Sequence, residues 1–315
     1  MDGVVARVFM TVMTLMMASV LVFGITEIIP GDPAAYMMGL NADPAALNAL
    51  RAEFGFDEPI LVRYGHWIGG MVHGDFGTSY TYRVPVAGLI AERLWVSVPL
   101  TLYTLALVLL LAVPLALVAV RFHRLWPDRL ISAGAGLGLA VPNFWLGVLL
   151  VGVFAVNLSW FSAGGFPGWQ AGLAPGLRAL TLPAIALAVP QAAILTRIMR
   201  TALLETASAD YVRTARAKGL SAGEILVRHQ FKNALIPVLT IIGLQFSFLI
   251  AGGVIIEKIF FLPGLGQLVL EAVAQRDLIT VRAIVMILIV LVLMVSLLVD
   301  LGYRLIDPRI RSGRP

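Results

Sequence analysis

The sequence predicts an all-α membrane protein with six transmembrane helices. Of its 315 residues, 59% are hydrophobic and 13% are charged, and the mean hydropathy of +0.92 far exceeds that of an ordinary soluble domain. The apolar residues gather into six runs, each long enough to cross or nearly cross a hydrocarbon core about 30 Å thick. These runs are residues 8–29, 98–120, 131–156, 180–198, 234–256 and 283–299.

The first run passes directly into the polar segment IIPGDPAAY, without the small-residue cleavage site of a secretory signal. We therefore expect residues 1–30 to hold a cytoplasmic end and an uncleaved first span. Residues 31–95 are mixed and polar, and they predict a small extracytoplasmic region. Two amphipathic pieces, residues 44–54 and 59–71, are expected to be helices within it, and GDFGTSY at residues 74–80 is a turn cluster.

The distribution of basic residues predicts that both termini are cytoplasmic. With the N-terminus inside, the cytoplasmic side collects most of the 23 Lys and Arg residues, as the positive-inside rule requires. The last ten residues, 306–315, are then a basic cytoplasmic tail. This topology explains the net charge of +5 and the pI near 9.8 without nucleic-acid binding.

The longest polar interruption in the second half is the loop of residues 205–233, and its pattern predicts two helices. Nothing in residues 207–218 breaks a helix, and Gly219 is suited to the left-handed position just past a helix end. Ser221 and Glu224 have the capping-box spacing and predict a second helix start. Such a basic helix between two spans fits a groove on a cytoplasmic partner. The alternative is a solvated loop held against anionic lipid.

Several stretches resemble one protein family. DYVRTARAKGL followed by RHQFKNALIP resembles the cytoplasmic EAA loop of bacterial ABC importer permeases, in the dipeptide/oligopeptide branch. PGDPA, GDFGTS, FLPGLG and the ending DLGYRLIDPRIR resemble the same family. Arg213 and Thr214 stand where the general motif begins Glu-Ala, only Ala215 and Gly219 agree, and the stretch from Gly219 to Pro237 is longer than the general pattern. Both departures are similar to those of the peptide branch.

The resemblance implies a type I ABC importer permease fold, with residues 96–305 as its transmembrane core. It implies that the loop is a coupling helix that seats in an ATPase subunit, and we expect Tyr211 and Ala215 to share its docking face. The residues to which this coupling role is assigned are Asp210, Tyr211, Val212, Arg213, Thr214, Ala215, Arg216, Ala217, Lys218 and Gly219.

The family further implies the partners and the cargo. The chain should pair with a second homologous permease in the bacterial inner membrane and bind two cytoplasmic ATP-binding subunits. A periplasmic or lipid-anchored binding protein should deliver the substrate. The expected substrates are dipeptides or oligopeptides, and the alternatives are nickel complexes, glutathione or another small solute.

The chain carries no catalytic or cofactor signature of its own. It has no GxxxxGK[ST] motif to cradle a nucleoside triphosphate, no cysteine, and four histidines without metal-ligand spacing. We therefore expect a non-catalytic subunit with no cofactor and no metal site. Gly134 and Gly138 lie inside an apolar run and are interpreted as helix-packing positions rather than as a nucleotide loop.

No ionisable side chain lies in the central part of any apolar run. This argues against an intramembrane enzyme and against an ion-coupled secondary transporter, and a transporter or channel without an ATPase would leave the coupling-like loop unexplained. Amides do lie there: Asn143, Gln191 and Gln245 are near the midpoints of the third, fourth and fifth runs. We expect them to line a translocation pathway, and the alternative is that each amide bonds a neighbouring helix.

Overall fold

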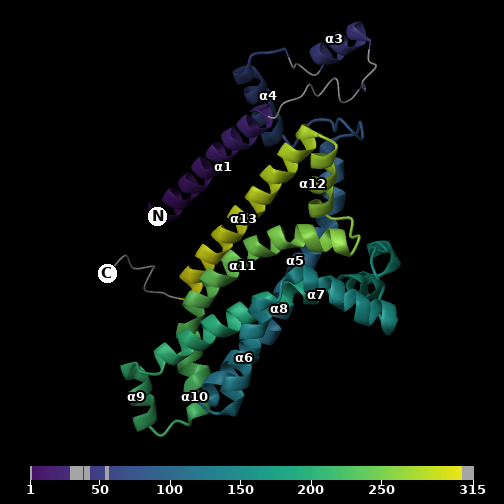
Figure 1. Cartoon of the computed structure of the whole chain (residues 1–315). Coiled ribbons are helices and arrows are strands. Elements are labelled where there is room, and N and C mark those ends of the chain that lie inside the picture. Colours follow the sequence, from purple (N-terminus) through teal and green to yellow (C-terminus); the bar gives the residue numbers. More distant parts are fainter. Residues whose placement is uncertain (1, 29–37, 39–42, 54–56, 307–315) are drawn as a thin grey trace. The chain divides into compact units, whose positions relative to one another are not determined.

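The computed structural model describes residues 2–28, 38, 43–53 and 57–306, and in these ranges the regular structure is helical (Figure 1). Residues 307–315 of the predicted tail lie outside the described residues. The chain divides into two compact units, Met1–Val96 with Gly264–Leu293 and Ser97–Pro263 with Met294–Pro315. Each unit is described by itself.

Five described helices are long and apolar enough to cross a membrane. All five begin before the apolar runs that predicted them, and four also end after them, because hydropathy marks only the part suited to hydrocarbon, whereas helix propensity continues into the polar flanks. They are α1 (Asp2–Ile28), α5 (Val86–Arg121), α8 (Leu173–Thr206), α11 (Phe231–Ile259) and α13 (Leu278–Ile306).

The third predicted span is not one continuous helix. Its residues form α6 (Trp126–Ala140) and α7 (Asn143–Leu150), which continues as a π-helical segment, and the two halves are bent by 95°. Pro142 explains the break, because a proline disfavours helical geometry at the residue before it and cannot donate a backbone hydrogen bond. Val141 accordingly has φ −87° and ψ 118°. A sixth span exists only if this bent pair is counted as one.

The first unit contains the two amphipathic helices expected before α5. They are α3 (Pro44–Glu53) and α4 (Ile60–Val72), which confirms both predicted pieces to within a few residues. The core of the unit joins Val86 and Ile90 of α5, Leu268 of α12 (Leu265–Ala274), and Ile284 of α13. The apolar segment after FLPGLG thus packs back on its neighbouring helices.

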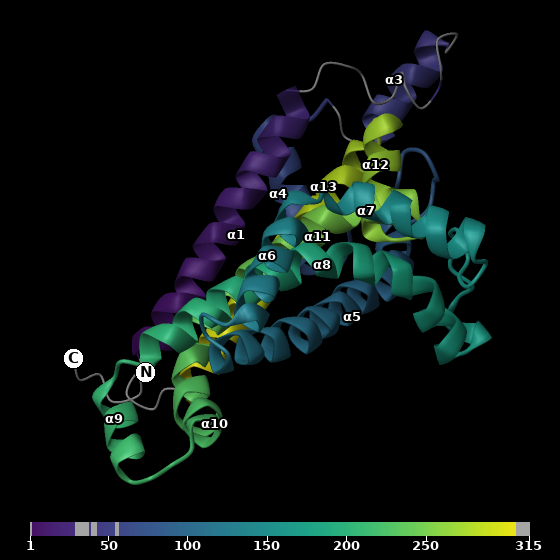
Figure 2. The same cartoon turned by 60° about the horizontal axis from the view of Figure 1, so that its bottom comes forward.

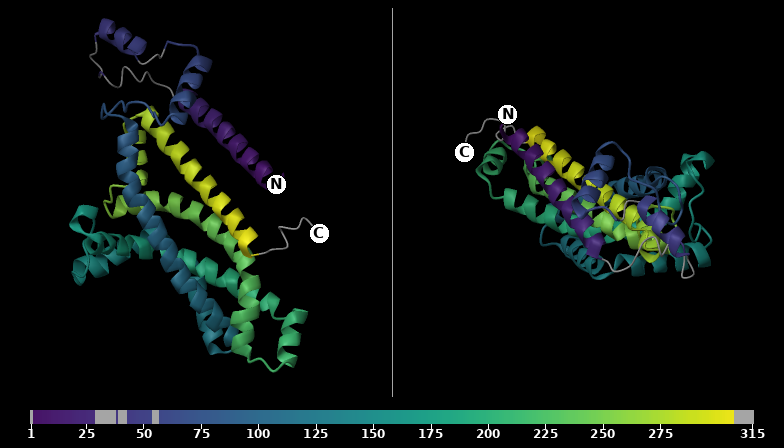
Figure 3. Two further views of the ribbon diagram at one scale, coloured as in Figure 1. Left: turned by 180° about the vertical axis from the view of Figure 1, so that it is seen from behind. Right: turned by 90° about the horizontal axis from the view of Figure 1, so that it is seen from above.

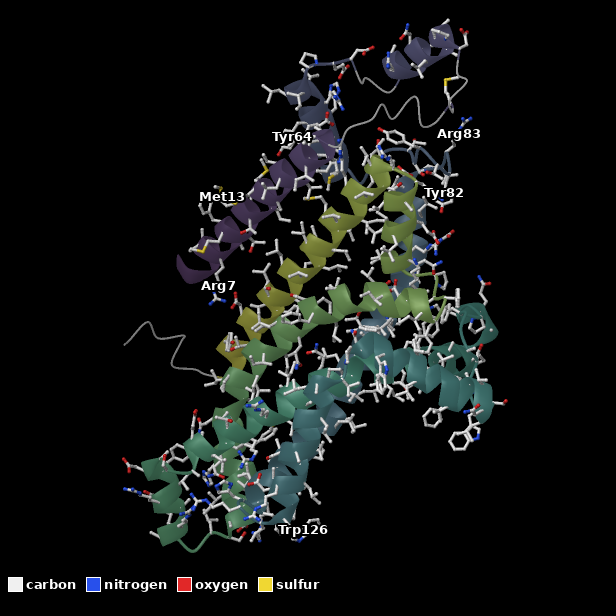
Figure 4. The ribbon with its side chains drawn as sticks, in the orientation of Figure 1. Arg7, Met13, Tyr64, Tyr82, Arg83 and Trp126 are labelled. Carbon is white, nitrogen blue, oxygen red and sulfur yellow. The ribbon has the colours of Figure 1, made fainter. Side chains whose placement is uncertain are left out.

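Helix α1 is held within this unit by one carboxylate and an aromatic cluster. Glu27 Oε1 accepts from Arg63 Nη2 at 2.8 Å and from Arg282 Nη2 at 2.6 Å, which ties α1 to α4 and α13. Tyr64 lies between α4 and α1 (Figure 4), where its ring meets Phe23 edge-on with centroids 5.4 Å apart. Polar pairing therefore reinforces apolar packing at this end of α1.

The second unit is organised around α8, and the middle of this helix is buried. Ala188 and Leu195 of α8 pack against Val108 of α5 and Val238 of α11 in one continuous cluster. Small residues allow the close approach of α6: a Cβ on Gly138 would lie 3.0 Å from that of Ala193. The packing role predicted for Gly138 is therefore confirmed, whereas no described atom beyond its own neighbours and helix backbone lies within 4 Å of a Cβ built on Gly134.

Candidate functional site

The loop predicted to meet a partner folds as a helical hairpin in the second unit. Helix α9 (Asp210–Ala217) follows α8 after a short turn, and α10 (Ala222–Ile225) then begins a helix that continues through a π-helical segment into α11. Figure 1, Figure 2 and the left view of Figure 3 all show α9 beside α10 at one end of this unit. The loop is thus an ordered projection.

Local hydrogen bonds define both ends of the turn between α9 and α10. Gly219 has φ +81°, its N–H donates to Arg216 O at 2.9 Å, and the N–H of Leu220 donates to Ala215 O at 3.2 Å, the Schellman pattern. Ser221 and Glu224 then form the full capping box, each side chain bonded to the other's backbone N–H. Both sequence predictions for this turn are confirmed.

Contrary to expectation, the structure does not place Tyr211 and Ala215 on one docking face of α9. Val212 and Ala215 are 0% and 4% exposed, and they pack on Ile225 of α10 and Leu220 of the turn. Tyr211, by contrast, is 39% exposed. Ala215 therefore supports the hairpin from within and cannot share an outer docking face with Tyr211.

The outer face of α9 is basic. Within the described residues, its ion pair from Arg213 to Asp210 at 3.7 Å joins side chains that are 75% and 96% exposed. Solvent screens such a pair, so the arginine remains available to a partner. The exposed residues of the predicted coupling set are Asp210, Tyr211, Arg213, Thr214, Arg216, Ala217, Lys218 and Gly219.

A buried ion pair anchors α8 above this hairpin. Asp128, in the first turn of α6, accepts from Arg200 Nε at 2.6 Å and from Arg200 Nη2 at 2.8 Å in a bidentate arrangement. The backbone N–H of Arg124 and the Nδ1 of His123 also lie within 2.9 and 3.1 Å of Asp128 Oδ2. The turn between α5 and α6 is thus tied to α8 two turns before α8 ends. Sequence reasoning missed this cluster because the pair is separated by 72 residues.

One of the three predicted pathway amides bonds to the backbone of another of these residues. Gln245 of α11 is 2% exposed, and its Nε2 donates to the backbone oxygen of Gln191 in α8 at 2.8 Å. The side-chain oxygens of both glutamines are buried and have no hydrogen-bond partner in the described structure. Gln245 therefore makes the helix-to-helix bond of the alternative interpretation.

Asn143 occupies a different kind of position. It is the first residue of α7 beside the break at Pro142, so its place at the midpoint of a straight span does not hold. Its Oδ1 accepts from the N–H of Phe144 at 2.8 Å, and its Nδ2 lies against Gly252 of α11, where a Cβ would approach to 2.9 Å. The argument from equal depth therefore fails for Asn143.

Other polar side chains do face open space in this unit. Arg197, Thr201 and Glu205 follow one another at intervals of four residues along α8, are exposed, and line a cavity of about 530 Å³. Leu139 of α6 and Pro237 of α11 contribute to its apolar wall. The i, i+4, i+8 spacing is a sequence signal that could have identified this face. Within the described ranges, no group of His, Cys, Asp or Glu could hold a metal ion.

Comparison with known proteins covers nearly the whole chain. The family model "Binding-protein-dependent transport system inner membrane component" matches residues 109–312, and the N-terminal model of the same transport systems matches residues 1–101. A protein of Brucella abortus (strain 2308) named as a peptide transport system permease is 39% identical over 308 residues, 98% of each chain. The glutathione transport system permease protein GsiC of Escherichia coli (strain K12) is 36% identical over 311 residues, 99% of each chain.

Two solved structures share the fold at low sequence identity. An inward-facing structure of the MetNI methionine ABC transporter aligns with a TM-score of 0.57 and 17% identity, over 70% of this chain and 96% of that one. An amino acid ABC transporter crystallised with histidines aligns with a TM-score of 0.51 and 20% identity, over 69% and 94%. At these identities the likeness concerns the fold alone.

Proposed function

Since the chain belongs to the family of binding-protein-dependent transport system inner membrane components, it is a permease subunit of an ABC importer, and we propose that it imports short peptides. The full-length similarity to a peptide permease carries this proposal. The similarity to GsiC favours glutathione, which is itself a small peptide, as a second candidate within the same class. Both relatives match across residues 31–95 as well as the core.

The permease is a multi-pass protein of the inner membrane, and ATP is hydrolysed by separate subunits of the transporter. We propose that this chain pairs with a second, homologous permease, and that each permease engages one of two cytoplasmic ATPases. A substrate-binding protein would deliver peptide on the opposite side. The positive-inside bias supports cytoplasmic placement of both termini and of the α9–α10 hairpin.

We propose that α9 is the coupling helix. Three observations support this role. The inner face of α9 packs on α10, the outer face of α9 is basic and exposed, and α9 follows the central helix α8 in the chain after a short turn. A rigid helix of this kind can transmit a push from a partner, because buried apolar contacts keep it from deforming separately from α10. Arg213 and Arg216 are suited to bind carboxylates on the ATPase surface.

Reconstitution tests the substrate assignment. The complete transporter, with its cognate permease, ATPases and binding protein, is placed in proteoliposomes, and uptake of radiolabelled trialanine and glutathione is measured. We expect ATP-dependent uptake of at least one of them, absent from a matched complex whose ATPases carry a substituted P-loop lysine. A complex that hydrolyses ATP but takes up neither compound would refute peptide import.

A further inference from the structure

The exposed face of α8 formed by Arg197, Thr201 and Glu205, here called the α8 ladder, has the chemistry of a binding surface. The three side chains line the 530 Å³ cavity already described, all within the second unit. Their spacing of four residues places them on one side of the helix, one turn apart.

The two charges of the α8 ladder are not used by the fold. Arg197 and Glu205 form no ion pair with any side chain of the described chain, whereas Arg200, only three residues from Arg197, is held by Asp128 in bidentate geometry. Arg197 lies at the end of the apolar run 180–198 and Glu205 lies seven residues beyond it, at the end of α8 that leads into the hairpin. The positive-inside bias places this end on the cytoplasmic side, where charged groups face water or a partner. The ladder would therefore border the cytoplasmic mouth of the pathway.

The rise along α8 between the two charged residues matches the length of a short peptide. Eight helical steps from Arg197 to Glu205 advance the backbone by about 12 Å along the helix axis. An extended chain advances at most about 3.3–3.6 Å per residue, so a peptide of about three or four residues spans the same distance. A free peptide carries a carboxylate at one end and an ammonium group at the other, which complements one cation and one carboxylate on the helix.

We propose that the α8 ladder is a peptide-binding segment of the translocation pathway. Arg197 binds the C-terminal carboxylate and Glu205 binds the N-terminal ammonium group. The Thr201 hydroxyl, which donates its proton to Arg197 O at 3.1 Å, accepts from a peptide N–H between them. This inference rests on the peptide import proposed above. It places the binding groups on the exposed face of α8, and it leaves the buried amides Gln191 and Gln245 as packing groups.

The first test compares substitutions against end-blocked peptides in the reconstituted transporter. Arg197→Gln should lower uptake of trialanine about tenfold but lower uptake of trialanine amide much less, because the amide has no carboxylate to lose. Glu205→Gln should show the same selectivity between trialanine and its N-acetyl derivative. Each loss is taken relative to the unsubstituted chain with the same peptide, so preferences of the binding protein cancel. Arg129→Gln, which removes an exposed charge from α6, is the matched control and should leave both ratios unchanged.

The second test uses the absence of cysteine from the natural sequence. Thr201→Cys in the complete transporter should react with a water-soluble thiol reagent during ATP turnover, and trialanine should slow that reaction. Ser208→Cys, on the exposed turn after α8, should react at a rate that trialanine does not change.

Three results would overturn the inference. Equal losses of uptake for free and end-blocked peptides would show that Arg197 and Glu205 do not bind the peptide termini. Labelling of Thr201→Cys that trialanine does not slow would show that peptide does not reach this face, and labelling seen in the isolated chain but not in the assembled transporter would assign the ladder to contact with the second permease. If the unsubstituted transporter takes up no peptide at all, the proposal of peptide import fails. If it takes up peptide and the ladder variants behave like the unsubstituted chain, only the ladder proposal fails.

Discussion

Removing one partner of the ion pair between Asp128 and Arg200 should strongly destabilise this end of the second unit. The Asp128 side chain is 5% exposed and that of Arg200 is 24% exposed. Removing one partner of a buried ion pair typically costs about 3–5 kcal/mol, because the other charge is left without compensation. Since Arg200 retains some exposure, we expect Arg200→Ala to lower the free energy of unfolding by about 3 kcal/mol.

The order of the two single substitutions tests the cause. Arg200→Ala leaves a buried carboxylate behind, whereas Asp128→Asn leaves a guanidinium that can turn toward water, so Arg200→Ala should be the more damaging change. The double variant should cost less than the sum of the two, because each single change already breaks the pair. Arg197→Ala, on the same helix but without an ion-pair partner in the described structure, is the control and should change stability by less than about 0.5 kcal/mol.

The measurement is equilibrium unfolding of the full chain in mixed micelles titrated with sodium dodecyl sulfate, followed by tryptophan fluorescence. If Arg200→Ala proved as stable as Arg197→Ala, the pair would not anchor α8 to the turn between α5 and α6. Additive effects of the two single substitutions would likewise contradict the argument, because they would mean that the two side chains do not interact.

Three further predictions concern topology, coupling and the buried amides. A tag in the turn at Phe122 should be inaccessible from outside spheroplasts and one at Gly165 accessible; labelling at Phe122 would reverse the proposed topology. Replacing Arg213 and Arg216 together by Glu should weaken association with the ATPases at least tenfold in a pull-down while leaving the unfolding transition unchanged, and unimpaired association would favour a lipid-facing loop. Gln245→Leu should preserve transport and change the free energy of unfolding by less than about 1 kcal/mol, because it removes a buried unpaired oxygen along with one hydrogen bond. Loss of transport by a stably folded variant would instead indicate that this amide lines the pathway.

Ala215 shows how a family motif can suggest the wrong geometry. The motif contains a small residue here, and a small residue suits a docking groove as well as an internal contact. The structure places Ala215 against Ile225 within the hairpin. A bulky residue at this position would therefore separate α9 from α10 and disturb the hairpin itself, so Arg213 and Arg216 are the better probes of docking.

Much of this protein is determined by the sequence over short distances. The apolar runs predict the long helices because hydrocarbon requires about 20 apolar residues to be crossed by a helix. Gly219 and the Ser221–Glu224 capping box locate the turn between α9 and α10 to the residue, since both act through hydrogen bonds within a few positions. The break at Pro142 is local as well, because the proline constrains Val141, but a hydropathy average does not register this constraint.

Tertiary structure alone decided which side of each helix is buried and which is exposed. Periodicity places Tyr211 and Ala215 one turn apart, but only contact with α10 buries Ala215 and leaves Tyr211 outside. The bond from Gln245 to Gln191 and the pair between Asp128 and Arg200 join residues 54 and 72 positions apart, which no local rule can match. The open cavity beside Arg197 and Glu205 likewise exists because α6, α8 and α11 pack as they do. Local chemistry acts through a few neighbouring residues, whereas burial depends on the whole set of helices that a segment meets.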